Sequence, residues 1–543
     1  MPAPPKHPGV DRPGSPWAAA ALLGATLGCA PAEPPPTPDV VWISVDTLRA
    51  DHLSAYGYGR ETSPNLDRLA ASGVRFETCL STTSWTLPSH LSMLTGLAIS
   101  AHGIDDERVY GAVGKPGAPE RVPLRGVFAS EVLAAAGYRT AGRYTWKYLD
   151  SSFGFGAGFE SWQRVGGTVH SDAALSKRFK ELVARRDKAR IDAWKAEKPE
   201  EFDYQRPADG FAVDAALAWL QETAGDPEPR FLFLHLFDPH DEYVPSAPFD
   251  RAFTDPDYAG NIDGRAVSSP RSPVHADMEA ADLEQLIALY DGEIAWTDRQ
   301  LGRLFDYVAQ SERSRDTLTL MTSDHGEEFF EHGGKTHRGQ LYMESVRVPW
   351  ILSWPRAVRG GRVIEGPVGL IDQAPTLYGL LGLEAPGLLS GSDLSEVVHG
   401  RERNAERTYS SLLLKFSGDY RPERHVALRR GAASYLFRYP RASEPELYAY
   451  DRSQTPNEEG PGQALGAEDP RTLEALALLD DLREDLRAQR DAAHPRKLEG
   501  ADLGAAELRE LEAMGYVGSS EPAELQTADE DRLALDGGLW PGN

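Results

Sequence analysis

The chain alternates short apolar segments with longer segments in which apolar residues recur every three or four positions. Short runs that are largely apolar are typical of strands buried on both faces of a parallel sheet. They cover Val40–Val45, Phe231–Phe237, Leu318–Thr322 and Pro349–Ser353. Amphipathic spacing predicts helices over Pro64–Gly73 and Leu283–Val308. Strands that alternate with helices predict an α/β fold, in which a large mixed, mostly parallel sheet is flanked by helices.

The pattern changes at about residue 400, where a smaller unit is predicted to begin. Strands are predicted over Tyr409–Phe416 and Ala433–Tyr439, and an acidic amphipathic helix over Leu473–Arg490. This pattern favours a C-terminal antiparallel α+β subdomain. The expected parts are a catalytic domain over residues 39–400, this subdomain over residues 401–519 and a flexible tail over residues 520–543.

Two segments of the catalytic domain have the composition of insertions. Ser176–Pro199 is rich in Lys, Arg and Glu and is predicted to be a solvated helix, whereas Asp255–Asp277 is rich in Gly, Pro, Ser and Asp and is predicted to be a surface loop. Loops of this kind usually carry substrate specificity, so the sequence alone does not identify the natural substrate.

The N-terminal residues 1–29 have the pattern of a secretory signal. Lys6 and Arg12 precede an apolar run from Trp17 to Leu27. This run is shorter than the roughly 20 apolar residues that a membrane-spanning helix needs. A basic start followed by a short apolar run instead predicts an exported protein.

The signal ends at a sequence that resembles a bacterial lipobox. It reads Thr-Leu-Gly-Cys and ends at Cys29, which would be lipidated, although Thr26 stands where such motifs prefer Leu. Ordinary signal cleavage near residues 30–32 is the alternative. Residues 30–38 are rich in proline and predict an extended tether. We therefore expect the protein in the bacterial cell envelope, facing the periplasm or the exterior, with the N-terminal lipid as its membrane contact.

Composition excludes several classes of protein. The chain has 543 residues, and a hydrophobic fraction of 41% is too high for a mainly disordered protein. Lys and Arg number 57 against 83 Asp and Glu, a net charge of -26. A general nucleic-acid binder needs a basic surface, so no nucleic-acid partner is expected. Two cysteines are too few for a disulfide framework or a cysteine-based zinc cluster.

Residues that can bind a metal follow three of the predicted strands. Asp46 follows the first, Asp238 and His240 follow the second, and Asp324 and His325 follow the third. A single Asp after a strand is usually a turn residue or a helix cap. Three such sets together favour a divalent-cation site, because ligands of open α/β sheets bind beyond the carboxyl ends of the strands.

A fourth element is a predicted helix that begins near Thr86. A hydroxyl at a helix N-terminus lies among free backbone N–H groups, which stabilise negative charge on the hydroxyl and on an incoming phosphate or sulfate. A nearby cation would lower the pKa of the hydroxyl and make it a nucleophile. The alternative, from this segment alone, is that Thr86 only caps the helix.

Several blocks of the chain resemble the sulfatase family within the alkaline phosphatase superfamily. They read VVWISVDTLRADHLSAYGYG, TTSWTLPSHLSMLTG, LFDPHDEYVP, SDHGEEFFEHGG and LYMESVRVP. The similarity extends over residues 39–516. It implies a large α/β fold around a mixed sheet with a small C-terminal sheet domain, and a metal-dependent hydrolase of sulfate or phosphate esters.

The chain departs from the sulfatases at the residues that carry their chemistry. Sulfatases convert the first residue of a CxPxR or SxPxR motif to formylglycine, and Thr86 stands at this position. The extra methyl group of threonine excludes the usual conversion. The motif's arginine is replaced by His90, and the second of two adjacent aspartate ligands by Thr47.

The remaining residues resemble one metal site of the superfamily's phosphodiesterases, which use an unmodified threonine as nucleophile. The resemblance implies a cation bound by Asp46, Thr86, Asp324 and His325, with Thr86 as the nucleophile. A nitrogen ligand from His325 favours Zn²⁺ or Mn²⁺, with Ca²⁺ as the alternative.

Two further histidines, His240 and His337, have two alternative roles in this resemblance. In a one-ion site, which we favour, they contact the oxygens of the anion or protonate the leaving group. In a two-ion site, they hold the second ion together with Asp238.

Substrate contacts are expected from His90 and from Lys147, with Arg143 as the alternative to Lys147. Three functions therefore compete. The first is hydrolysis of a small-molecule or glycan ester, with phosphate favoured over sulfate because a sulfated threonine lacks formylglycine's route for expelling sulfate. The second is transfer of a phosphoryl-linked group to an envelope glycan. The third is anion binding by an inactive lipoprotein. The sequence does not indicate the oligomeric state.

Overall fold

A computed structural model describes residues 37–104, 124–165, 208–269, 272–402, 407–415, 423–440 and 445–492. These residues belong to a compact unit that begins at Thr37. The predicted signal and lipobox, the charged insertion 176–199 and the tail 520–543 lie outside the described residues. Among the helices that are described, none combines the length and the apolar character needed to cross a bilayer.

The centre of the fold is a sheet of eight strands in the order β10-β2-β9-β6-β1-β5-β3-β4. Strand β9 is antiparallel to both of its neighbours, and the other adjacent pairs are parallel. The strands are β1 (Asp39–Val45), β2 (Val74–Leu80), β3 (Arg139–Tyr144), β4 (Ser161–Arg164), β5 (Arg230–Leu236), β6 (Thr317–Ser323), β9 (Arg347–Ser353) and β10 (Arg362–Gly369).

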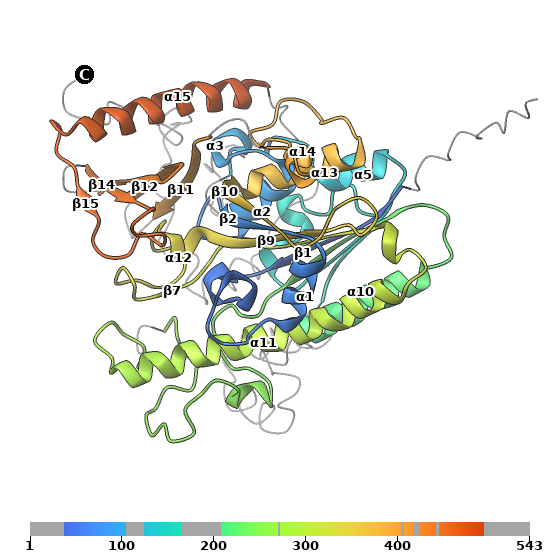
Figure 1. The fold of residues 1–543 in the computed structure, drawn as a ribbon, viewed down its shortest axis with the longest axis horizontal. Coiled ribbons are helices and arrows are strands. Elements are labelled where there is room, and N and C mark those ends of the chain that lie inside the picture. The colour runs from blue at the N-terminus through green and yellow to red at the C-terminus, as the bar shows by residue number, and fades with distance from the viewer. Residues whose placement is uncertain are drawn as a thin grey trace, which may run out of the picture. The chain divides into compact units, whose positions relative to one another are not determined.

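Helices cover both faces of this sheet (Figure 1). Alternate side chains of β1 enter two different cores, because successive residues of a strand point to opposite faces. Val40 and Trp42 pack with α2 (Thr86–Thr95), α5 (Ala129–Ala135) and α13 (Gln373–Leu381). Val41, Ile43 and Val45 pack with α1 (Pro64–Ser72), α10 (Ala208–Glu222) and α11 (Ala280–Gln310). The shorter helices are α3 (Ile99–His102), α12 (Met343–Val346) and α14 (Ser395–Val398).

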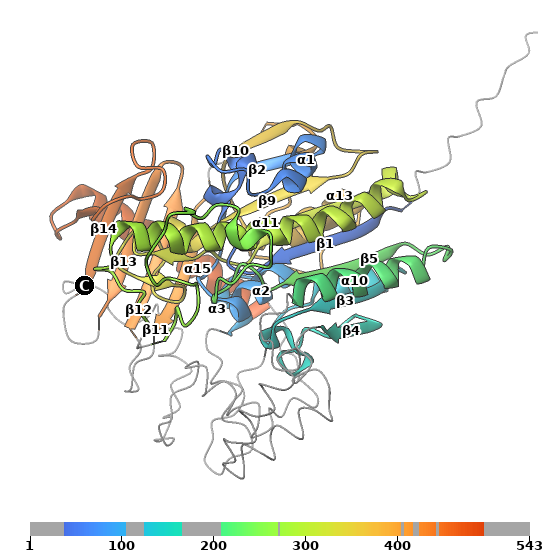
Figure 2. The ribbon, with the colours of Figure 1, turned by 90° about the horizontal axis from the view of Figure 1, so that it is seen from below.

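A second, antiparallel sheet of five strands follows, and Figure 2 shows β11–β14 side by side. Its elements are β11 (Tyr409–Lys415), β12 (Glu423–Arg430), β13 (Ala433–Tyr439), β14 (Glu446–Asp451), β15 (Gln463–Ala464) and α15 (Pro470–Ala492). Arg429 forms a buried ion pair with Glu458 within this part of the chain and also donates to the carbonyl of Leu341, which links the second sheet to the main domain. A hairpin of β7 (Glu328–Phe329) and β8 (Lys335–Thr336) lies between β6 and β9 in the chain.

The predicted fold class is confirmed, including the smaller antiparallel sheet. Four strands of the eight-stranded sheet, β2, β3, β4 and β10, were not predicted from the sequence, and neither were β7, β8, β12, β14 and β15 outside it. Strand β3 reads RTAGRY and lacks a continuous apolar run. Strands β4 and β10 are the two edges of the sheet, and they carry polar and partly exposed residues. The apolar-run criterion detects only strands that are buried on both faces.

Candidate active site

The ends of β1 and β6 bring a first group of polar side chains together. These strands are parallel neighbours, so the residues that follow them leave the sheet at the same edge. His325 Nε2 lies 3.4 Å from Asp46 Oδ1, 3.3 Å from Asp324 Oδ2 and 3.4 Å from Thr86 Oγ1. All four side chains are buried. The residues predicted to form the cation site therefore converge at one point.

The carboxylates of this group have the properties of cation ligands. Both oxygens of Asp46 and Oδ2 of Asp324 are buried without a hydrogen-bond partner among the described residues. Burial and the neighbouring Asp46 raise the pKa of Asp324 well above its ordinary value. Burial alone would raise the pKa of Asp46, but the neighbouring imidazole of His235 and the electrostatic effects of His240 and His325 lower it to about 2. A divalent cation would satisfy the free oxygens and remove the repulsion between the carboxylates.

The imidazole of His325 is in the form that binds a cation. Its Nδ1 lies 3.0 Å from the carbonyl oxygen of Gly326, which only accepts hydrogen bonds, so Nδ1 carries the proton. Nε2, which faces the carboxylates, therefore holds a lone pair in the neutral ring. Burial lowers the pKa of His325 to about 4, which keeps the ring neutral.

Thr86 is the first residue of α2, and the capping position before it is occupied by Trp85. No side-chain capping hydrogen bond is present at this end of α2. The Thr86 hydroxyl faces His325 instead, and the free N–H groups of the first helical turn lie beside it. The alternative, in which Thr86 only caps the helix, therefore does not describe its position.

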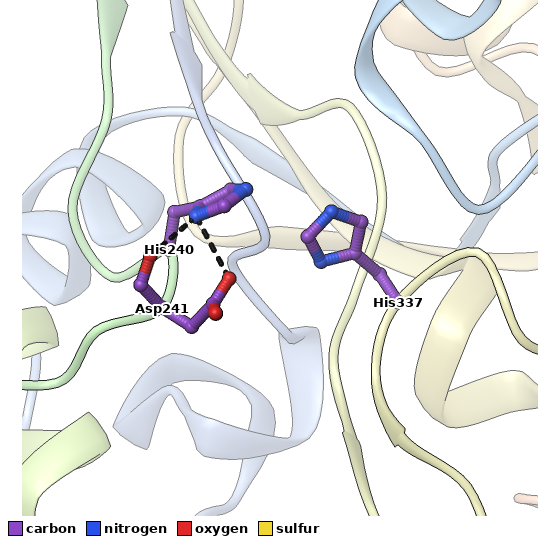
Figure 3. Close-up of side chains that lie close together, drawn as sticks. All are labelled: His240, Asp241 and His337. Carbon is purple, nitrogen blue, oxygen red and sulfur yellow. Dashed lines mark hydrogen bonds and ion pairs between the residues drawn. The ribbon is translucent and has the colours of Figure 1, made fainter. Parts of the chain in front are cut away.

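A second group lies next to the first and consists of His240, Asp241 and His337 (Figure 3). His240 Nδ1 lies 2.8 Å from the backbone oxygen of Asp241 and 3.1 Å from its Oδ1. The rings of His240 and His337 are 4.7 Å apart, as are those of His325 and His337, so the two groups are adjacent. The carboxylate in this group is Asp241, where we had expected Asp238.

Hydrogen bonds also determine which nitrogens of the second group are free. His240 Nδ1 donates to the Asp241 carbonyl, and His240 Nε2 is buried without a partner among the described residues. His337 Nδ1 lies 3.2 Å from a carboxylate oxygen of Glu327. Burial and the charges of His325, His240 and Arg338 lower the pKa of His337 well below its ordinary value. A neutral imidazole is a weaker acid toward a leaving group than an imidazolium, so the lowered pKa makes that predicted role of His337 less favourable.

His90 holds the backbone of Thr86 in place. It is fully buried, and its Nδ1 donates to the carbonyl of Thr86 at 2.9 Å while Ser44 Oγ bonds Nε2 at 2.9 Å. Both ring nitrogens are therefore used within the protein. The predicted substrate contact of His90 is corrected on this ground: the side chain holds the first residue of α2 and leaves no nitrogen for a substrate.

Lys147 remains a predicted substrate contact, and the structure gives its place. Its ammonium group lies 5.4 Å from the ring centre of Trp146, and that ring lies 5.8 Å from the ring of His240. Arg143 instead donates to the carbonyl of Gly142 and to the hydroxyl of Ser161 on strand β4.

Three polar residues near the site were missed by the sequence analysis. His235 Nε2 lies 3.5 Å from Asp46 Oδ2, Asp241 belongs to the second group, and Glu327 contacts His337. His235 is a histidine within the apolar part of a buried strand, and a polar residue at such a position could have indicated a site residue. Asp241 and Glu327 stand in polar stretches that carry no such signal.

Comparison with known proteins identifies the family. The sulfatase family model matches residues 38–383, more than half of the chain. The chain belongs to the sulfatase family. A second model, the C-terminal region of N-sulphoglucosamine sulphohydrolase, matches residues 331–468. The matched relatives include named sulfatases, and enzymes of this family generally require a divalent metal, so the chain is a hydrolase that acts on ester bonds.

Similar curated proteins include both sulfatases and a broader superfamily member. An ulvan-active sulfatase of Formosa agariphila is 24% identical, and the match covers 81% of this chain and 79% of the sulfatase. The multifunctional alkaline phosphatase superfamily protein PehA of Trinickia caryophylli is 27% identical, covering 66% and 76%. Human arylsulfatase A is 26% identical, covering 87% and 91%.

Solved structures share the fold at lower identity. A structure in complex with its substrate D-glucosamine-2-N,6-O-disulfate has a TM-score of 0.61 and 17% identity, covering 86% of this chain and all (100%) of that one. The phosphonate monoester hydrolase of Agrobacterium radiobacter has a TM-score of 0.59 and 20% identity, covering 85% and 100%.

The substitution Asp324→Asn tests the repulsion within the first group. We expect it to raise the free energy of unfolding in EDTA by about 1 kcal/mol or more, because one of two buried like charges is removed. We also expect the affinity for Mn²⁺ to fall by roughly 100-fold or more. Urea unfolding with EDTA and with Mn²⁺ measures both effects. Asp306→Asn, at an exposed ion pair, is the control. A variant less stable than wild type in EDTA would contradict the argument.

Proposed function

We propose that the chain is a metal-dependent phosphoester hydrolase that acts on mono- or diesters, with unmodified Thr86 as its nucleophile. One observation carries the proposal. The Thr86 hydroxyl lies at the N-terminus of α2, 3.4 Å from His325 Nε2 in the group that suits a cation. A cation bound at this group would favour deprotonation of the hydroxyl, and the free backbone N–H groups at the N-terminus of α2 would bind the phosphoryl oxygens.

The proposed reaction has two steps. Thr86 Oγ attacks phosphorus and its hydroxyl proton passes to water, the bond from phosphorus to the ester oxygen breaks, and the alcohol leaves with that electron pair and takes a proton from water. Water then attacks the phosphorus of the Thr86 ester, and the threonine oxygen is released and protonated again. Asp46, Asp324 and His325 would hold the cation, which when bound lowers the pKa of the hydroxyl. His90 fixes the backbone of Thr86 throughout.

Sulfate-ester hydrolysis is the competing activity, since several relatives are named sulfatases. Two features favour phosphate. Threonine has a methyl group on Cβ that excludes conversion to formylglycine, and a sulfated threonine has no aldehyde hydrate from which sulfate can be expelled. The second feature is the comparison with related chains: PehA is an alkaline phosphatase superfamily protein, and a phosphonate monoester hydrolase has the same fold. Both support a reaction at phosphorus. The structure that holds a glucosamine disulfate supports a small-molecule or glycan ester as the substrate class.

Thr86→Ala and Thr86→Ser test the nucleophile. We expect Thr86→Ala to lower kcat by roughly 1,000-fold or more on nitrophenyl phosphate or bis-nitrophenyl phosphate, whereas Thr86→Ser keeps a hydroxyl and most of the activity. The assay includes Zn²⁺, Mn²⁺ or Ca²⁺ in turn, and nitrophenyl sulfate as the competing substrate.

Each competing function predicts a different outcome of this experiment. Turnover of the sulfate ester alone would replace the phosphoester proposal. Metal-dependent turnover that survives in Thr86→Ala would remove Thr86 as the nucleophile. A wild-type protein that turns over none of the substrates but still binds phosphate would support the alternative of an inactive, anion-binding protein. Transfer of the phosphoryl-linked group to an added sugar in preference to water would support a transferase.

The second group bears on the number of cations. His240 Nδ1 donates to a carbonyl, so His240 Nε2 carries a lone pair in the neutral ring, and burial lowers the pKa of His337, which lies against Glu327. A lone pair suits a cation, whereas a neutral imidazole is a weaker acid toward a leaving group than an imidazolium. We therefore include in the proposal a second cation site formed by His240, Asp241 and His337, in place of the one-ion arrangement that the sequence favoured.

Metal analysis of the purified protein tests this addition. We expect two Zn²⁺ or Mn²⁺ ions per chain after equilibration and one in the variant His337→Ala, because one of three ligands is lost. Asp324→Asn is the matched variant and should also lose one ion, from the first group. A wild-type content of one ion that His337→Ala leaves unchanged would return His240 to the role of leaving-group acid.

We also propose that Cys29 is lipidated and anchors the enzyme in the bacterial cell envelope. The support is the apolar run that ends at a lipobox-like sequence and the proline-rich segment after it. In a bacterial host, we expect the wild-type chain to partition into the detergent phase of Triton X-114 and Cys29→Ser into the aqueous phase. Equal partitioning of the two chains would favour ordinary signal cleavage.

A further inference from the structure

The turn that follows β1 contains a residue in an unfavourable conformation. Thr47 has a φ of 52°, in the left-handed region, although it is β-branched. Such a conformation is strained for a residue other than glycine and persists only where neighbouring groups enforce it. Thr47 directly follows Asp46, so its backbone angles set the path by which the chain leaves Asp46 at the end of β1.

Hydrogen bonds tie this turn to the other cation ligands. The N–H of Thr47 donates to Asp324 Oδ1 at 3.3 Å, and the N–H of Leu48 donates to Ser323 Oγ at 3.0 Å. Ser323 Oγ in turn donates to the carbonyl of His325 at 2.8 Å. The left-handed turn therefore determines how the end of β1 meets the end of β6.

Two further backbone groups of the turn are bound by one side chain from a helix. The hydroxyl of Tyr290, on α11, donates to the carbonyl of Thr47 at 2.8 Å and accepts from the N–H of Arg49 at 3.1 Å. Tyr290 is fully buried, so water cannot replace either hydrogen bond. One hydroxyl thus binds the turn on both sides of Leu48.

The ring of Tyr290 is itself held in place. His52 packs against it edge-on at 5.1 Å, and Phe329 and Tyr243 pack at 5.0 Å and 5.5 Å. His52 Nδ1 is bound to Asp291, which follows Tyr290 on α11, at 2.8 Å. The hydroxyl therefore has little freedom to move away from the turn.

We propose that Tyr290 is a positioning residue for the cation site. Its hydroxyl stabilises the left-handed conformation of Thr47 and thereby holds Asp46 opposite Asp324 and His325. The inference rests on the proposed cation site, because the position of Asp46 matters only if these residues bind an ion. Tyr290 does not touch the cation or the substrate in this scheme, so its effect passes through the backbone of Thr47.

The single substitution Tyr290→Phe, which leaves Asp46, Asp324 and His325 unchanged, tests the proposal. We expect its affinity for Mn²⁺, measured by competition with a chelator, to fall roughly 10–100-fold, as is typical for loss of a group that orients a ligand. Tyr138→Phe is the matched control. Tyr138 is also buried, but it precedes β3 and so lies at the amino ends of the parallel strands, away from the cation site. The affinity of Tyr138→Phe for Mn²⁺ should stay within about twofold of wild type.

Rescue separates positioning from a general loss of structure. Glycine adopts positive φ without strain, so Thr47→Gly should remove much of the need for the hydroxyl. We expect the double variant Thr47→Gly/Tyr290→Phe to bind Mn²⁺ within about threefold of Thr47→Gly alone. This comparison is decisive even if Tyr290→Phe alone fails to fold, since both chains contain the glycine.

The outcomes distinguish this inference from the proposed function. Wild-type protein that does not bind Mn²⁺ or Zn²⁺ would overturn the cation site itself. Wild-type binding that Tyr290→Phe leaves unchanged would overturn the positioning role while leaving the cation site intact. A double variant that binds much more weakly than Thr47→Gly would show that the hydroxyl does not act through Thr47, and would equally overturn the inference.

Discussion

Two buried carboxylates, Asp46 and Asp324, face each other at the carboxyl edge of the sheet, and the arrangement of the site depends on their repulsion. Three of their four oxygens have no hydrogen-bond partner among the described residues. Burying like charges without partners is costly, so such a pair persists in proteins where a cation or a shared proton compensates it. The neutral His325, with a lone pair toward both carboxylates, favours the cation.

The fold positions these groups with rigid elements and not with long loops. Asp46 and Asp324 directly follow two paired strands, and Thr86 opens a helix that packs on one face of the same sheet. The helix on the other face supplies Tyr290, which reaches the turn after β1. Both helical layers therefore contribute to one site, and the sheet between them sets the distances.

Much of this arrangement was predictable from the sequence. The runs that became β1, β5 and β6 are continuous and apolar because both faces of those strands are buried, and their ends indicated Asp46, His240, Asp324 and His325. The edge strands β4 and β10 were missed because partly exposed strands have no such pattern. The role expected for His90 was wrong because sequence cannot reveal that Ser44 and Thr86 use both of its nitrogens.

The sequence by itself determined the fold class, the family and the kinds of residue at the site, because these follow from local patterns and from motifs of fixed spacing. Only the tertiary structure decided which carboxylate joins His240 and His337, which imidazole nitrogens hold lone pairs, and how the turn at Thr47 is held. The physical reason is that hydrogen bonds over long sequence separations determine these features. Tyr290 binds Thr47 across more than 200 positions of the chain, and no local pattern records that contact.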